Sequence, residues 1–206
     1  MALITNFGSL KSALTEYLRH PRWTASYDLA TQNFENSINR RLSVRPMETV
    51  KNLTTINGSI PLPDDYMLWR TVLFTGATPF EELDYVHPAY LDTTLNVTGG
   101  NPKLFTIEGS TLKTRPINDT LDIFEFHYFS KVPTIIGNDS NTNWLIAEHS
   151  DAYLYGVMVE LFALQRNIEG ATLYKQRRDE VLQEIIGEYA DGVGATSPLV
   201  RSDGYF

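Results

Sequence analysis

Hydrophobic side chains fill almost every direction around a helix predicted at about residues 150–166, SDAYLYGVMVELFALQR, where Glu160 is the only charge between the first and last turns. A helix that is apolar on all sides must be buried on all sides. Ser150 is predicted to cap its N-terminus. Gly156, in the middle, is tolerated most easily where another backbone approaches closely. We expect either a central core helix or a helix that a neighbouring subunit partly covers.

A second helix, of opposite character, is predicted at about residues 170–190. Its apolar residues form one stripe at helical spacing, and charged residues cover the other directions. The stripe comprises Tyr174, Val181, Leu182, Ile185, Ile186 and Tyr189. Gly192 is suited to end this helix, because glycine accepts the left-handed conformation beyond a helix end. The two helices together are predicted to form a hairpin.

The first 46 residues show the same helical period. A short amphipathic helix is predicted at about residues 9–19, where leucines recur every fourth position. A longer one follows at about residues 27–42, capped by Ser26 or Asp28. Its core-facing residues are Ala30, Phe34, Ile38 and Leu42. Both helices end before a proline, which cannot continue a helix.

From about residue 47 to residue 135 the apolar period changes to two, which is typical of β-strands. Strands are predicted at about residues 47–53, 69–74, 103–108, 111–115 and 121–129. The last three are expected to form a meander with 121–129 in a central position. Asn57-Gly58 predicts a tight turn, and the prolines at 61 and 63 predict a sheet edge. One short helix is expected at about residues 79–86, interrupted by Pro88.

These elements predict an α+β fold, a helical bundle with an antiparallel β-rich insertion and an extended C-terminal tail. Residues 1–190 are expected to form a single domain. The tail, residues 191–206, holds glycines and a proline that prevent a helix, and also apolar residues that a purely solvating linker would lack. We therefore predict that the tail binds a partner through Leu199, Val200, Tyr205 and Phe206.

Composition narrows the classes of function. The chain is 42% hydrophobic, has no cysteine, and carries a formal net charge of −8. No apolar run is long enough to span a bilayer and no secretory signal is visible, so we expect a soluble protein made in the cytoplasm, without contact with a membrane. The acidic balance argues against a surface that grips nucleic-acid phosphates. A negative net charge suits the lining of a channel through which DNA passes without binding.

No cluster of residues predicts catalysis. Glu148, His149, Ser150 and Asp151 include every residue type of a hydrolase triad, but triad members come from separated positions so that their side chains converge. The histidines have no metal-binding spacing, and no phosphate-binding glycine motif occurs. We therefore predict no catalytic, cofactor-binding or metal-binding residues, and no cofactor.

Four segments, in this order, resemble the head-to-tail adaptor (connector) proteins of tailed bacteriophages. They are NPKLFTIEGSTLKTRPI, FEFHYFSKVP, NWLIAEHSDAYLYGVMVELFALQRN and ATLYKQRRDEV. The resemblance covers about residues 99–190, and Asn101 departs from the residue often seen before the proline. It implies a helical bundle with a β insertion, assembled into a ring of twelve subunits beneath the portal, with no catalytic residues.

The expected function is therefore that of a structural virion protein. Its ring would join the capsid portal to the tail and continue the DNA channel, at the head-tail junction of the virion. Expected partners are other copies of the chain, the portal protein and the tail or neck proteins below, with DNA only in passage. The alternatives are a monomeric virion assembly factor or binding module and, less favoured by the sequence, an enzyme with a composite site.

Overall fold

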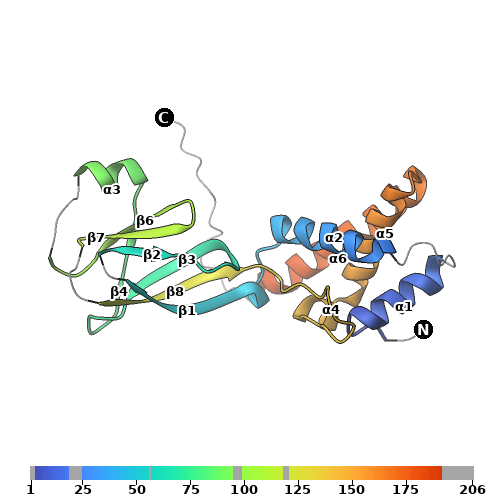
Figure 1. The fold of residues 1–206 in the computed structure, drawn as a ribbon, viewed down its shortest axis with the longest axis horizontal. Helices are drawn as coiled ribbons and strands as arrows, with labels where there is room; N and C mark the ends of the chain where they lie inside the picture. The colour runs from blue at the N-terminus through green and yellow to red at the C-terminus, as the bar shows by residue number, and fades with distance from the viewer. Residues whose placement is uncertain (1–2, 19–24, 56, 95–98, 118–120, 192–206) are drawn as a thin grey trace. The chain divides into compact units, whose positions relative to one another are not determined.

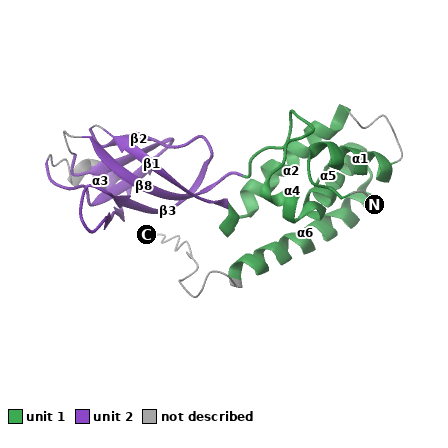
Figure 2. Cartoon of the chain, turned by 90° about the horizontal axis from the view of Figure 1, so that it is seen from below, with its two compact units in different colours: residues 1–46, 132–206 green, residues 47–131 purple. Residues whose placement is uncertain are grey.

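The computed structural model describes residues 3–18, 25–55, 57–94, 99–117 and 121–191 (Figure 1). The fold class is α+β, as predicted. The chain forms two compact units, coloured separately in Figure 2. Residues 1–46 and 132–206 form the first, which we call the helical unit, and residues 47–131 form the second, which we call the β unit. The β unit thus spans most of the stretch with an apolar period of two.

The helical unit is built around one central helix. Its helices are α1 (Phe7–Leu18), α2 (Tyr27–Arg41), α4 (Trp144–Glu148), α5 (Ser150–Leu164) and α6 (Ile168–Asp191). Helix α5 packs against all four of the others. Buried residues lie on all sides of α5 from Ala152 to Leu161, so the prediction of a core helix is confirmed. The residues that bury this helix belong to the same chain. Its last turn leaves the core, because Phe162 is half-buried and Leu164 is exposed.

Gly156 lies where α5 meets α2. A Cβ atom at this position would lie 2.0 Å from Cε2 of Phe34. The expectation of a close backbone neighbour is therefore wrong, because an aromatic ring fills the space beside the glycine. The Phe34 ring also meets the Tyr153 ring edge to face, at a centroid distance of 5.1 Å. Glycine is needed here for the close packing of a phenyl ring.

The helix cap predicted at Ser150 is wrong. Ser150 is already helical, and His149 precedes it without a side-chain cap hydrogen bond. The capping residue of this region is Asn143, whose side-chain oxygen accepts a hydrogen bond from the Ile146 N–H at the start of α4. The sequence pattern missed α4 because it is only five residues long and runs directly into α5. At the other end of the hairpin, α6 includes Asp191, the first residue of the predicted tail.

Two side chains of α2 hold the segment that leads from the β unit back to the helices. Asn39 accepts a hydrogen bond from the Val132 N–H, at 2.9 Å. Glu35, one turn earlier on the same face, accepts one from the Ile135 N–H, also at 2.9 Å. These bonds satisfy backbone donors that no helix or strand pairs, and so attach the segment to α2.

Glu35 is a buried carboxyl group at the centre of a polar network. The Tyr153 hydroxyl donates to Glu35 Oε1 at 3.2 Å, and the Asn143 amide donates to the Tyr153 oxygen at 2.7 Å. Burial raises the pKa of Glu35, and the hydrogen bonds that it accepts offset this only in part. Burial and the neighbouring Glu35 likewise raise the pKa of Tyr153. The neutral form of Glu35 is therefore favoured more strongly in the folded state than in the unfolded state.

Replacing Glu35 by glutamine is expected to remove a pH-dependent loss of stability. A carboxyl whose pKa is higher in the folded state stabilises the fold below its unfolded pKa, and this contribution is lost as pH rises through the folded pKa. In denaturant titrations from pH 4 to pH 8, the free energy of unfolding of Glu35→Gln should increase relative to that of the wild type as pH rises. Glu16→Gln, at an exposed position of α1, is the matched control. A variant less stable than the wild type at pH 8 would contradict this account.

The β unit consists of two four-stranded sheets, in the strand orders β1-β8-β3-β4 and β2-β7-β6-β5. The strands are β1 (Glu48–Thr55), β2 (Ser59–Pro61), β3 (Tyr66–Phe74), β4 (Glu81–Glu82), β5 (Asp84–Tyr85), β6 (Leu104–Glu108), β7 (Thr111–Arg115) and β8 (Asp122–Ser130). A short 3₁₀ helix, η2 (Arg45–Met47), precedes β1, and helix α3 (Pro88–Thr94) precedes β6. All the pairings are antiparallel except that of β5 with β6. Buried residues of both sheets form one core cluster.

Three predictions for the β unit are confirmed. Asn57 and Gly58 both have positive φ, 64° and 66°, as a tight turn requires. Strand β2, which ends at Pro61, lies at the edge of its sheet. Strand β8 is central, between β1 and β3, as predicted, although only one of its faces is buried and the other carries Glu125 and His127.

Two other predictions are wrong. The expected meander is limited to β6 and β7, because β8 pairs along its length with β1 in the other sheet. No helix forms at about residues 79–86, because this stretch contains the short strands β4 and β5. The helix of this region is α3, which follows them. Pro88 starts α3, where its missing N–H leaves no hydrogen bond unmade.

Candidate functional site

Two of the four consecutive residues that include every residue type of a hydrolase triad, Glu148 and His149, contact α6. The His149 ring meets the rings of Trp144 and Tyr189 edge to face, with centroids 6.4 and 6.1 Å away. The Tyr189 hydroxyl donates to Glu148 at 2.8 Å, and His149 Nε2 lies 3.8 Å from a Glu188 oxygen. Burial and the Glu148 carboxylate raise the pKa of Tyr189 to about 12. These contacts account for Glu148 and His149 as packing residues.

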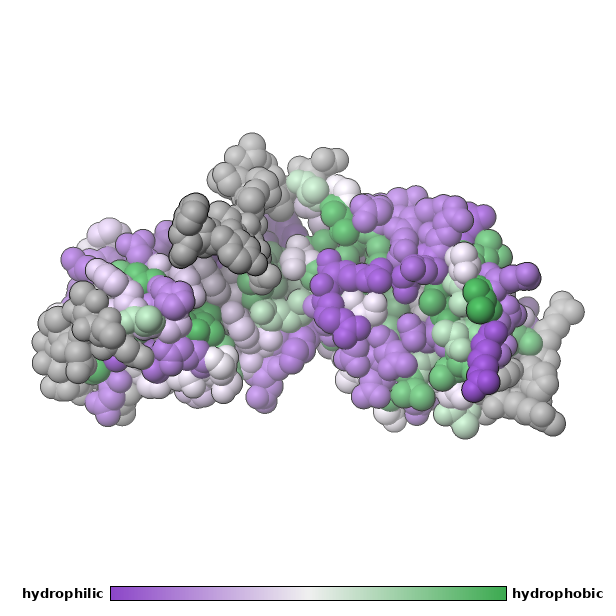
Figure 3. Space-filling view, turned by 90° about the horizontal axis from the view of Figure 1, so that it is seen from above, coloured by the Kyte–Doolittle hydropathy of each residue, from purple (hydrophilic) through white to green (hydrophobic). Residues whose placement is uncertain are grey.

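Within the described ranges, no group of three or more His, Asp and Glu side chains is placed to hold a metal ion. Nor is any helix in those ranges both long and apolar enough to cross a bilayer. Hydrophobic residues lie among hydrophilic ones over the face of the molecule in Figure 3. The surface of the helical unit nevertheless carries two distinct features, a groove and an apolar projection.

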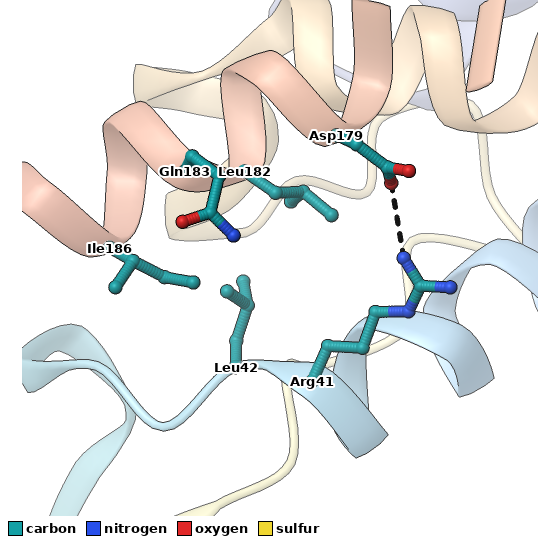
Figure 4. A pocket seen from close by; sticks show the side chains of 6 residues that line it. All are labelled: Arg41, Leu42, Asp179, Leu182, Gln183 and Ile186. Carbon is teal, nitrogen blue, oxygen red and sulfur yellow. Dashed lines mark hydrogen bonds and ion pairs between the residues drawn. The ribbon is translucent and has the colours of Figure 1, made fainter. Parts of the chain in front are cut away.

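The groove lies between the end of α2 and the second half of α6 and has a volume of about 380 Å³ (Figure 4). It is lined by Arg41, Leu42, Asp179, Leu182, Gln183 and Ile186. Leu42 and Leu182 are buried, whereas Ile186 is 36% exposed. In Figure 4 the Leu42 side chain points towards α6. We call this feature the α2–α6 groove, and its floor is apolar.

One carboxylate holds the polar end of the α2–α6 groove together. Asp179 Oδ1 accepts a hydrogen bond from Arg41 Nη1 at 3.1 Å, across the groove. The same oxygen accepts two more from the buried side chain of Arg178, at 3.0 and 2.8 Å. Asp179 therefore ties α6 to α2, and its single negative charge is shared between the two arginines.

The apolar projection lies at the α5–α6 turn, orange in Figure 1. Leu164, Ile168 and Leu173 are 46%, 79% and 56% exposed. We call these three residues the apolar tip. Single exposed aliphatic residues are ordinary, whereas these three lie within ten consecutive positions around one turn.

The turn that carries the apolar tip is firmly built. Arg166 adopts a positive φ of 57°, which reverses the chain after α5. The Asn167 side chain then accepts a hydrogen bond from the Gly170 N–H at 2.9 Å and so caps α6. The Phe162 ring packs against Gly170 and stacks on the Tyr174 ring at a centroid distance of 5.3 Å. The tip is therefore presented in a defined geometry.

Sequence reasoning missed both features. Its site residues, Leu199, Val200, Tyr205 and Phe206, lie outside the described residues. The groove residues Leu182 and Ile186 were recognised only as parts of an apolar stripe. The sequence did contain one indication of the apolar tip: Ile168 and Leu173 are apolar but lie outside that stripe.

A helical unit with a groove and a projecting apolar tip is typical of a protein that acts by assembly with other proteins. Residues 5–202 match the profile of the SU10 adaptor protein family, so the chain belongs to that family. The resemblance to phage adaptors is thereby confirmed, and the chain is a structural phage adaptor that contacts other virion proteins. The family is structural rather than enzymatic. No curated protein sequence matches the chain.

Proposed function

We propose that this adaptor forms a ring that joins the capsid portal to the tail and continues the channel through which DNA passes. The family match over residues 5–202 is the observation that carries the proposal. The rigid apolar tip and the groove support it, because a subunit with two different contact surfaces can close into a ring. We keep twelve as the expected number of subunits, the number that the resemblance to phage adaptors implies.

Electron microscopy of the purified chain mixed with its portal protein tests this proposal directly. We expect an additional ring of density on one end of the portal, coaxial with its channel. A chain that remains monomeric in the mixture would favour the alternative of an assembly factor. So would binding at a few copies per portal without a closed ring.

The DNA channel implies a second expectation. With a net charge of −8 the ring should present carboxylates to passing DNA, so that phosphates are repelled and not retained. Fluorescence anisotropy with a labelled DNA duplex at about 50 mM salt should detect no binding. The test is stringent, because proteins that bind DNA phosphates do so strongly at this low ionic strength. Tight binding that weakens steeply with salt would contradict an acidic channel.

The residues that follow α6 are proposed to act as an extended attachment segment. Leu199, Val200, Tyr205 and Phe206 would anchor it on the portal or on a neighbouring adaptor. Deleting residues 195–206 is expected to leave the melting temperature nearly unchanged while weakening attachment to the portal. Co-sedimentation with the portal and a thermal melt measure the two effects. Full attachment by the truncated chain would contradict the proposal, and a failure to fold would show that the segment belongs to the core.

A further inference from the structure

We propose that the apolar tip of one copy docks into the α2–α6 groove of the next copy, in a head-to-tail contact that repeats around the ring. The inference rests on the proposed ring and identifies the surfaces through which its subunits meet. Such a contact is heterologous, with two different patches on every subunit, and this is the kind of contact that generates closed rings.

The tip cannot reach the groove of its own molecule. Helix α6 runs without interruption from Ile168, in the tip, to Ile186, in the groove. At a rise of 1.5 Å per residue these two residues are separated by about 27 Å along the helix axis. Any contact between tip and groove therefore joins two molecules.

The two surfaces match in chemistry. The groove has an apolar floor, formed by Leu42 and Leu182, with Ile186 at its exposed side. The tip offers aliphatic side chains of the same kind, of which Ile168 is the most exposed at 79%. Burying them in the groove removes apolar surface of both copies from water.

Charge along α6 favours a second copy as the occupant. The region of the tip carries three basic residues and one acid, namely Arg166, Lys175, Arg177 and Glu169. In the second half of α6, where the groove lies, Asp179 binds both Arg178 and the groove-lining Arg41, and Glu180 is paired with Arg177 at 3.7 Å. Among the described residues, Glu184 and Glu188 are the exposed acids of this half that have no Arg or Lys partner. Tip-to-groove docking therefore brings basic residues of one copy to acidic residues of the next, and such complementarity also sets the orientation of the contact.

Two of these charges are available for the contact. Among the described residues, neither Lys175 nor Glu184 takes part in a hydrogen bond or an ion pair.

The competing occupant is the chain's own C-terminal segment, residues 192–206, which is long enough to reach the groove. That segment carries one base and one acid, Arg201 and Asp203, so it offers no net charge to match the acidic half of α6.

Cysteine cross-linking tests the contact, because the chain has no cysteine of its own. The variant Ile168→Cys/Ile186→Cys places one thiol on the tip and one at the groove. The two are about 27 Å apart within a molecule, far beyond the Cα separation of about 4.4–6.8 Å that a disulfide spans. Under mild oxidation we expect a ladder of species larger than dimers on a non-reducing gel. The matched control, Ile168→Cys/Leu29→Cys, uses an exposed residue at the opposite end of α2 and should give no ladder.

The outcomes separate this inference from the ring proposal. If native mass spectrometry shows oligomers but the tip-groove variant gives no ladder, the ring stands and the contact is wrong. An equal ladder from the Leu29 control also overturns the contact. A ladder that forms only after residues 192–206 are deleted assigns the groove to the chain's own end and overturns the inference. If the wild type stays monomeric at every concentration and with its portal, the ring itself fails.

Charge reversal gives an independent readout on the same cysteine background. Lys175→Glu is expected to lower the ladder yield up to about fivefold by placing an acid of one copy against an acid of the next. Adding Glu184→Lys reverses both partners and should restore the yield. A yield that the second change lowers further would overturn the proposed pairing.

Discussion

Replacing Leu161 by alanine is expected to lower the free energy of unfolding of the helical unit by about 2–5 kcal/mol. Leu161 is fully buried in α5, the helix against which all the other described helices of this unit pack. The substitution removes apolar contacts and leaves a cavity that the surrounding helices can fill only in part. Urea denaturation followed by circular dichroism at 222 nm, which reports on the helices, measures the effect.

Leu164→Ala, one turn later in the same helix, is the matched control. Leu164 is 46% exposed, so the same change of side chain should alter stability by no more than about 0.5 kcal/mol. Phe162, half-buried and stacked on Tyr174, should fall between the two. Equal stabilities of the Leu161 and Leu164 variants would show that α5 is not the core of the unit.

Replacing Gly156 by alanine is expected to lower stability by about 1–3 kcal/mol through overpacking. Alanine is the better helix former, so helix propensity alone predicts the opposite sign. The new methyl group would lie 2.0 Å from the Phe34 ring, which is itself fixed against Tyr153. Steric conflict therefore outweighs propensity, and thermal and chemical denaturation of the purified variant should both show the loss.

Gly187→Ala is the control for this prediction. Gly187 lies in α6, and a Cβ atom there would meet nothing within 4 Å. This variant should gain about 0.5–1 kcal/mol, the usual difference between the two residues in a helix. Adding Phe34→Leu to Gly156→Ala should cost less than the sum of the single changes, because the smaller side chain relieves the conflict. A Gly156 variant as stable as the Gly187 variant would show that Phe34 moves aside freely.

The candidate surfaces could be predicted only in part. The apolar character of Ile168 and Leu173 is visible in the sequence, and so is the change from basic to acidic residues along the last helix. The α2–α6 groove could not be predicted, because Leu42 and Leu182 are far apart in the chain and meet only through the packing of two helices. Local pattern carries no information on which distant residues face each other.

The sequence by itself determined those elements whose patterns admit one solution. A helix that is apolar on every side has no stable place except a core, so the position of α5 followed from its residues alone. The central position of strand β8 was also predicted, although one of its faces is buried and the other carries Glu125 and His127. The tertiary structure alone decided which strands flank β8, and that the space beside Gly156 is filled by Phe34. Strand pairing and close packing depend on the shapes of segments distant in sequence, so neither is encoded in the period of one segment.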